Sequence, residues 1–393
     1  MADAAGAAVD RTLIADGSPY YLRISNLFRA DLGLTFANSE LAASYSLSLV
    51  PDLLTLKVAP FHVGDLRYSY TASRFVFSLT QTLGAGERIF LGAGRASPLV
   101  GLAPVQDPRP TAPAPPALAT PGSIDSGVLP GARMLPSVAS RSTAAVSYRW
   151  ERRLSSAFVV GYQMYGGLGR DAQRYLALQR VVDAGASVAY GMSARVDLVS
   201  GLVFARGWNS SDNKYALLTL SESWLYKWTS TTSLDLGAGI SSRETESSDE
   251  PTRLTTTPVA AIGLTQALTG RDTTGSLRLG VTYAPLVDSV TGQIANRLAV
   301  LGSATAAHGD LHAGVGAGLS QAIPASDPGA VTSLTANVYA GYQISSWLGA
   351  SLSAYVARQT IVTTGLPAAT LLPSGVTWGV YGGLYAVSPT LRF

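Results

Sequence analysis

Cysteine is absent from the 393 residues of this chain, and only three residues are histidine. Without a thiol the chain has no disulfide framework, no cysteine-based metal site and no thiol nucleophile. A chain without free thiols is compatible with an oxidising compartment. Long apolar stretches are also missing, because no run approaches the ~20 residues of a membrane-spanning helix.

Charge is scarce as well. Charged residues make up 13% of the chain, about half the usual share for a soluble globular domain. The net charge of +3 is not clustered, so the sequence carries no electrostatic signature of nucleic-acid binding. Yet hydrophobic residues reach 47%, and they are spread singly along the chain. A closed β-barrel is the only membrane-spanning alternative to helices, and this composition favours one.

Alternation with a period of two dominates the chain. In the segment 28–36 the even positions are apolar, whereas the odd positions include Arg29, Asp31 and Thr35. The ranges 41–49, 234–240 and 311–320 repeat the pattern, with a polar face made mostly of Ser, Thr and Gly. A large soluble all-β protein would carry more Lys, Glu and Arg on its exposed face. We therefore predict an all-β fold, a transmembrane antiparallel up-and-down β-barrel.

The spacing of the connections predicts the number of strands. From residue 142 onward, short and long links alternate and separate 13 segments. Before residue 95 about five more segments begin, near Phe28, Leu41, Leu53, Leu66 and Arg74. The prediction is about 18 strands, with a range of 16 to 20. An even number leaves both termini in the periplasm, on the side of the tight turns.

Two parts of the chain depart from this rhythm. Residues 1–26 form a predicted periplasmic leader, and residues 27–393 form a single barrel. The proline-rich range 96–137 cannot be a regular strand, because proline removes ladder donors. We expect a long extracellular loop there; the alternatives are an inward constriction or a lid across the mouth. No secretory signal is visible, so Met1 is interpreted as an added start on a mature chain.

Features that suggest catalysis or metal binding have simpler explanations. His308 and His312 have the i, i+4 spacing of a helical metal pair, but they flank a strand turn. Asp310 beside His312 has no nucleophile nearby. The glycines of the range 314–320 fall at every second position, unlike a phosphate-binding loop. We predict no enzyme activity, no cofactor and no metal.

Alternation also predicts which side chains face the interior. A charge on the lipid face at mid-depth would cost roughly 2–4 kcal/mol, so the charged residues should point inward. Their signs are mixed, which argues against strong ion selectivity. The tyrosines on this face either stack on sugar rings or simply pack. The predicted solute pathway consists of Arg29, Asp31, Asp183, Asp197, Asp235, Arg278, Tyr339, Tyr355 and Tyr381.

The chain ends on SPTLRF, and Leu391 and Phe393 resemble the assembly signal that the barrel-insertion machinery reads. Pro389 interrupts this ending, so the last strand either reaches Phe393 or stops near Val387. By pattern, residues 27–393 resemble Gram-negative outer-membrane β-barrels. More narrowly, SYSLSLVPDLLTL, the proline-rich excursion, GLTQALTG and the LRF ending resemble myxobacterial 18-stranded barrels associated with polysaccharide export.

This resemblance implies a position in the outer membrane, in contact with outer-membrane lipid and lipopolysaccharide. It also implies two protein partners, the barrel-insertion machinery and a periplasmic polysaccharide-export protein. The function hypothesis that follows is a passive conduit for a surface polysaccharide. Two alternatives stay open: a general or nutrient-uptake porin, and a non-conducting adhesin or structural barrel that displays the range 96–137.

Overall fold

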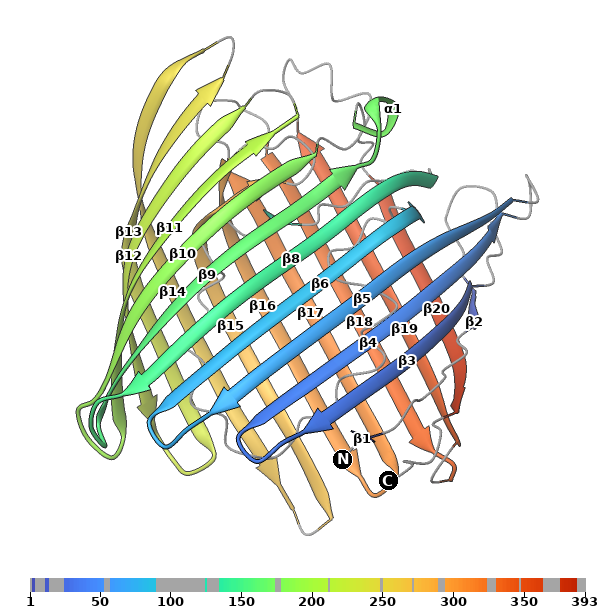
Figure 1. The fold of residues 1–393 in the computed structure, drawn as a ribbon, viewed down its shortest axis with the longest axis horizontal. Coiled ribbons are helices and arrows are strands. Elements are labelled where there is room, and N and C mark those ends of the chain that lie inside the picture. Colours follow the sequence, from blue (N-terminus) through green and yellow to red (C-terminus); the bar gives the residue numbers. More distant parts are fainter. Residues whose placement is uncertain are drawn as a thin grey trace.

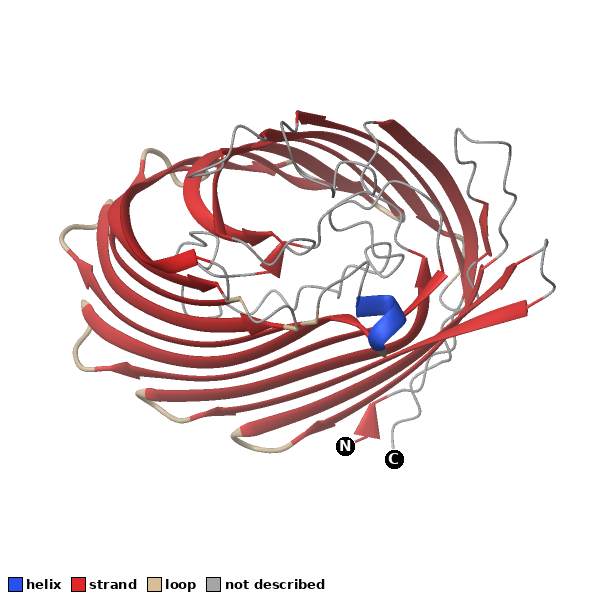
Figure 2. Cartoon of the chain, turned by 90° about the horizontal axis from the view of Figure 1, so that it is seen from above, coloured by secondary structure: helices blue, strands red, loops and turns tan. Residues whose placement is uncertain are grey.

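The computed structural model consists almost entirely of β-strands arranged as one curved wall (Figures 1 and 2). The residues that it describes are 2–3, 11–13, 25–52, 57–89, 124–125, 134–173, 178–210, 213–247, 250–270, 272–288, 294–323, 330–345, 348–362 and 375–386. Over these residues, no helix is long and apolar enough to cross a membrane.

Twenty strands and one short helix are present. Three strands have only two or three residues, and the other seventeen have 11 to 20 residues each. The elements are β1 Ala2–Asp3, β2 Arg11–Leu13, β3 Ser25–Thr35, β4 Ser39–Asp52, β5 Lys57–Thr71, β6 Phe75–Ile89, β7 Ile124–Asp125, β8 Met134–Arg149, β9 Leu154–Gly167, α1 Arg170–Gln173, β10 Gln179–Gly191, β11 Val196–Asn209, β12 Lys214–Lys227, β13 Thr232–Ser247, β14 Glu250–Thr269, β15 Thr273–Asp288, β16 Ile294–His308, β17 Leu311–Ile323, β18 Ala330–Gln343, β19 Leu348–Val362 and β20 Gly375–Ala386.

Each long strand pairs antiparallel with the next one along the chain, which confirms the predicted up-and-down fold. We call the two ends of the wall the turn end and the α1 end (Figure 1). Tight connections such as 36–38, 192–195 and 309–310 gather at the turn end. The tightest contains Gly309 with a φ of +54°, a left-handed conformation that two-residue hairpins require and glycine adopts without strain.

In the second half of the wall the strands agree with those predicted from the sequence, and in the first half they differ in number and position. Thirteen long strands follow the proline-rich range, as predicted, but only four long strands precede it. The two strands expected to begin near Leu53 and Leu66 are replaced by one continuous strand, β5. In β5 the apolar residues Phe61 and Val63 share a face with the charged Asp65, so apolar and polar residues do not alternate regularly. For this reason the sequence pattern did not predict one continuous strand.

The predicted loop 96–137 is shorter than expected at its end. Residues 134–137 already belong to β8, and Ile124 and Asp125 form β7, which pairs parallel with the end of β15. Proline was expected to exclude strand here. Pro136 is tolerated because it precedes the first residue pair of β8 with β9, Ser137 with Gly167, so its missing N–H removes no ladder donor there. Its carbonyl accepts a hydrogen bond from the Leu168 backbone N–H at 2.7 Å. The rest of the loop lies outside the described residues.

The first and last long strands, β3 and β20, are not paired with each other, so the long strands alone do not close the wall. Within the described residues, the three-residue β2 is the only strand that pairs with both, antiparallel in each case. Because β3 and β20 run in the same direction, an antiparallel sheet needs one more strand between them, and β2 occupies that place. Part of the predicted leader 1–26 therefore belongs to the sheet.

We expect residues 12 and 381 to be close enough for a disulfide. In the register, Thr12 faces Tyr381, and facing residues of an antiparallel pair have α-carbons about 4.5–5.5 Å apart. The native chain has no cysteine, so the double variant Thr12→Cys/Tyr381→Cys would carry only this pair. Under oxidising conditions it should form an intramolecular disulfide, seen as a reductant-sensitive shift on a denaturing gel. The control Thr12→Cys/Leu352→Cys should not, and equal cross-linking in both would contradict a β2 seam.

The outer face of the wall is apolar. On β10–β14 one alternating set of side chains is exposed and mostly apolar, with its charged members mainly near the α1 end, and the other set is buried or polar. Exposed aromatic residues gather near the turn end, as expected for an interfacial girdle. They are Trp150, Tyr190, Trp224, Tyr226, Trp228 and Tyr342. On β12 a charged residue, Glu222, interrupts the apolar band and faces Ser200 and Ala238 on the neighbouring strands.

Candidate functional site

A polar belt crosses the inner face on the strands β4, β5 and β6. Asp65 is its first centre: its carboxylate accepts a hydrogen bond from Ser44 Oγ at 3.2 Å and another from Thr82 Oγ1 at 2.6 Å. Ser44 and Thr82 are the register partners of Asp65 on either side. Since hydrogen bonds to an ionised carboxylate are strong, the two hydroxyls fix the orientation of this charge.

The belt continues across β8, β9 and β10. Arg141 faces Thr82 on one side and Gln163 on the other. Gln163 in turn donates a hydrogen bond from Nε2 to the buried Asp183 carboxylate at 3.3 Å. Asp183 lies against Gly161, whose missing side chain leaves room for the carboxylate. Acids, a base and neutral hydrogen-bonding groups therefore alternate over six consecutive strands. We call this set the polar belt: Ser44, Asp65, Thr82, Arg141, Gln163 and Asp183.

A second feature lies on β17 and β18. The Tyr339 ring rests on the bare backbone of Gly314, and a β-carbon there would collide with it. In the same way, Asn337 covers Gly316. One residue pair reverses the direction, because His312 on β17 covers Gly341 on β18. The glycines let these larger groups lie flat on the wall, so the groups offer their faces to the interior without projecting far into it.

We call this second set the aromatic strip: His312, Asn337 and Tyr339. The rings of His312 and Tyr339 are tilted at 50°, with their centroids 6.4 Å apart. The strip belongs to the distant wall of Figure 1, whereas the polar belt lies on the near wall, from β4 to β10. The view from above shows the strands curving round, so that the two sets lie on opposite sides of the enclosed region (Figure 2).

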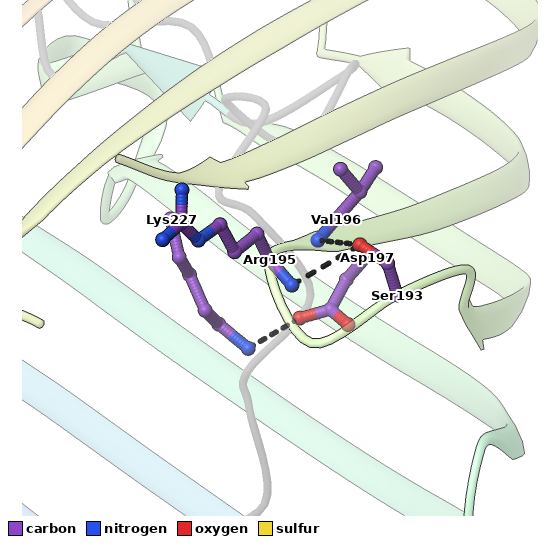
Figure 3. Close-up of polar contacts among 5 residues, drawn as sticks. All are labelled: Ser193, Arg195, Val196, Asp197 and Lys227. Carbon is purple, nitrogen blue, oxygen red and sulfur yellow. Dashed lines mark hydrogen bonds and ion pairs between the residues drawn. The ribbon is translucent and has the colours of Figure 1, made fainter. Parts of the chain in front are cut away.

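The predicted residue Asp197 forms an ion pair at the turn end (Figure 3). Lys227 Nζ lies 2.8 Å from Asp197 Oδ2, and both side chains are partly exposed. Beside them the turn is held by Ser193, whose Oγ accepts hydrogen bonds from the backbone N–H groups of Arg195 and Val196, both at 3.1 Å. The ion pair neutralises Asp197, and a partly exposed pair adds only about 0–1 kcal/mol to stability.

The other predicted pathway residues are scattered. Arg278 is exposed on the inner face, between Thr265 and Ser303 in the register. Asp235 is the fourth residue of β13, near the turn end, and its buried Oδ1 has no hydrogen-bond partner among the described residues. In the register Tyr381 shares a partner, Ser353, with Tyr339. The side chains of Arg29, Asp31, Tyr355 and Tyr381 lie outside the described set, and so do Leu391 and Phe393. Their contribution to a pathway stays a prediction.

Sequence reasoning missed most of the polar belt. Of its six members only Asp183 was predicted, while Asp65 and Arg141 were not. Asp65 was hidden by the irregular alternation of β5. The partnership of Thr82 with Arg141 joins residues on either side of the proline-rich range, and no local pattern signals it. By contrast, the alternating glycines of β17 were a usable signal for space on the inner face.

We expect an alanine at position 314 to displace Tyr339 from the wall. The new β-carbon would occupy the position of the ring, and the ring, as the end of a side chain, can swing inward. A matched control is Gly280→Ala, because Gly280 also faces inward but a β-carbon there has its nearest neighbour at 3.7 Å. If the interior conducts ions, Gly314→Ala should lower single-channel conductance and Gly280→Ala should not. Equal conductance in both variants would contradict the placement of the ring.

Metal binding has no support among the described side chains, which contain no group of three or more His, Cys, Asp or Glu placed to hold an ion. His308, one of the two histidines with helical spacing, instead has its Nδ1 3.0 Å from Thr273 Oγ1. His312 points along the inner face over Gly341. The two imidazoles thus make separate contacts and do not face a common site.

No family model and no curated protein matches this chain. Solved structures do match. Two variants of the FrpB iron transporter from Neisseria meningitidis have TM-scores of 0.50 and 0.51 at 10% and 9% identity. The fold is that of an outer-membrane β-barrel. OccK11 (OpdR) from Pseudomonas aeruginosa aligns over 100% of this chain and 96% of its own, with a TM-score of 0.46 at 10% identity.

The extent of the match is uneven. The alignments cover 91% and 95% of this chain but 64% and 67% of the two FrpB chains. This chain thus spans about two thirds of the length of the FrpB structures. At such low identity the likeness concerns the fold alone, and the function must be argued from the inner face of this chain.

Proposed function

We propose that this protein is an outer-membrane channel that gives a surface polysaccharide a passive route out of the cell. The observation that carries the proposal is the inner face, where a polar belt on one wall faces an aromatic strip on the other. Sugar rings present hydroxyl groups at their edges and apolar C–H faces. The belt can exchange hydrogen bonds with the former, and Tyr339 and His312 can pack against the latter.

The arrangement favours movement over tight binding. Most groups of the belt are already hydrogen-bonded within the wall, so a passing sugar would gain only weak additional contacts. Conduction needs binding that is favourable enough for entry and weak enough for release. The mixed charges argue for a neutral or weakly charged solute, and nothing in this mechanism requires a chemical step. Synthesis of the polymer and periplasmic partners would supply the driving force.

In this proposal the turn end faces the periplasm and the α1 end faces the outside. Outer-membrane barrels have short periplasmic turns and longer external loops. In this chain every connection between long strands at the turn end has two to four residues, and all the longer connections are at the α1 end. The strand β20 ends at Ala386, on the periplasmic side. A periplasmic export protein would then meet the pore at the turn end, and the barrel-insertion machinery would read Leu391 and Phe393.

The aromatic strip gives a direct test. With a long neutral glucan such as dextran as probe, Tyr339→Ala should shorten polymer-induced current blocks about 3- to 10-fold, as expected for losing an aromatic contact of ~1 kcal/mol. Tyr342→Ala is the matched control, because Tyr342 is on the same strand but exposed on the outer face. Equal effects of the two substitutions would contradict a sugar contact at Tyr339.

The nutrient-uptake porin remains the main alternative. It predicts that small solutes block the current and that long glucans have no effect. A non-conducting adhesin predicts no current at all, even after residues 96–133, the part of the predicted loop that precedes β8, are deleted. Single-channel recording with small solutes and long glucans therefore distinguishes the three functions.

A further inference from the structure

Three cations gather on the outer face at the α1 end, on the strands β10, β11 and β12. Arg180 and Lys214 both face Trp208 in the register, one from each neighbouring strand. Arg206 is the next outward-pointing residue below Trp208 on β11. We call Arg180, Arg206 and Lys214 the cationic patch. All three side chains are exposed.

The geometry lets the three charges converge. Neighbouring strands are about 4.8 Å apart, so the backbones at Arg180 and Lys214 are separated by roughly 10 Å, with Trp208 between them. Arg206 is a diagonal neighbour of both, at a distance that long side chains bridge. A pocket of about 390 Å³ lies here, lined by Arg206, Gly207, Trp208, Asn209 and Lys214, and Arg180 is across from Trp208 at its side. One multivalent anion could therefore contact all three cations.

The cations are only partly compensated by acids. Lys214 Nζ lies 3.4 Å from Glu246 Oε1, and this pair is exposed on both sides. Glu244 is also on β13, two strands away from Arg206. Over the described side chains, Arg180 and Arg206 make no ion pair with any acid. Two guanidinium groups thus remain available, and guanidinium is the group that recognises phosphate with paired hydrogen bonds.

The position of the cationic patch relative to the lipid-facing band indicates which kind of molecule carries the anion. Directly below it, toward the turn end, the outward side chains on the same strands are the apolar Val182, Phe204 and Leu218. Below that level the outward side chains on these strands are apolar down to the aromatic girdle, apart from Ser200 and Glu222. The cations therefore lie at one boundary of the lipid-facing band, where lipid headgroups are found, with Trp208 at the same level.

We propose that the cationic patch binds the phosphate groups of an anionic lipid in the surrounding membrane. The two arginines would hold phosphate oxygens, Lys214 would add a third positive charge, and Val182 and Phe204 would contact the acyl chains below. This site is on the outside of the wall. It is independent of the proposed conduction and would stand even if the interior conducted nothing.

Lipid titration followed by native mass spectrometry tests the proposal. The full chain in detergent is titrated with diphosphorylated lipid A, and bound lipid is counted. The triple variant Arg180→Gln/Arg206→Gln/Lys214→Gln should bind about 100-fold more weakly, as expected when about 1 kcal/mol is lost for each of the three cations near a headgroup. The control is Arg67→Gln/Arg141→Gln/Arg278→Gln, which removes three exposed cations from the inner face and should leave lipid binding unchanged.

Two further titrations distinguish specific binding of the lipid phosphates from non-specific electrostatic attraction. Dephosphorylated lipid A should bind the native chain and the triple variant equally weakly. Inorganic phosphate at millimolar concentration should not displace the lipid. Folding of both variants is checked by their heat-dependent migration on denaturing gels. Equal losses in the two triple variants, or no loss in either, would overturn the proposal; displacement by free phosphate would overturn the assignment to a lipid.

Discussion

Replacing Leu217 with alanine is expected to lower the free energy of unfolding by about 2–5 kcal/mol. Leu217 is 1% exposed and belongs to a small apolar cluster on the inner face with Val181, Ala205 and Tyr215. The cluster is well filled, because the Tyr215 ring lies on Gly207 and occupies the space of a side chain. Removing the leucine would leave a cavity that these neighbours cannot close.

The adjacent residue supplies the control. Leu218 points to the opposite face of the same strand and is exposed there. Its truncation to alanine should cost less, about 1–2 kcal/mol, because mobile lipid chains fill the vacated space. Both values are measured by reversible denaturant titration in lipid vesicles, with tryptophan fluorescence as the signal. If Leu218→Ala costs as much as Leu217→Ala, the inner cluster is not a packed core.

Replacing Leu220 with arginine should cost about 2–4 kcal/mol in the same assay. Leu220 is the seventh of the 14 residues of β12, and it is 61% exposed on the outer face between Leu202 and Ile240. In a bilayer this position is near mid-depth. A guanidinium there must either enter hydrocarbon or draw water and headgroups inward.

Leu301 is a close match with the opposite expectation. It is the eighth of the 15 residues of β16, it is 58% exposed, and it faces the interior between Gly280 and Gly318. Leu301→Arg should therefore change stability little in vesicles, since its guanidinium would meet water. Comparable costs for the two substitutions would mean that the faces are assigned wrongly or that the interior is dry.

These two leucines show what alternation alone could predict. Leu220 and Leu301 have the same residue type and similar exposure, and only their phase within a strand separates inside from outside. That phase was readable wherever large apolar residues alternate with Ser, Thr and Gly, as in β13 and β17. From Met134 onward the predicted strand number is therefore confirmed. In β5 the inward Val63 and the outward His62 invert the pattern, and the prediction there was wrong in detail.

Pairing between segments that are far apart in the chain could not be predicted from the sequence. The β2 seam joins Thr12 to Tyr381, and nothing in the three residues of β2 signals a partner at the other end of the chain. One step of the polar belt, from Thr82 to Arg141, likewise joins strands that are separated by the proline-rich range. Charges on the inner face were predicted as single residues, whereas their arrangement into a belt opposite an aromatic strip follows only from the paired strands.

The outer face also has charged residues that the sequence did not predict there. Charges were expected to point inward, yet Arg180, Arg206 and Lys214 point outward. They lie at the boundary of the apolar band, where the cost of a charge falls to about 0–1 kcal/mol. Glu222 is a different case, because it interrupts the band itself, and nothing in the described structure explains it.

Single-channel recording in a planar bilayer tests the central claim most directly. The full chain is inserted, and the current is recorded with and without long dextran on the side of the turn end. A conducting interior predicts discrete current steps, and a polysaccharide route predicts transient blocks by dextran that Tyr339→Ala shortens and Tyr342→Ala leaves unchanged. No current from the folded protein, with or without residues 96–133, would contradict the account.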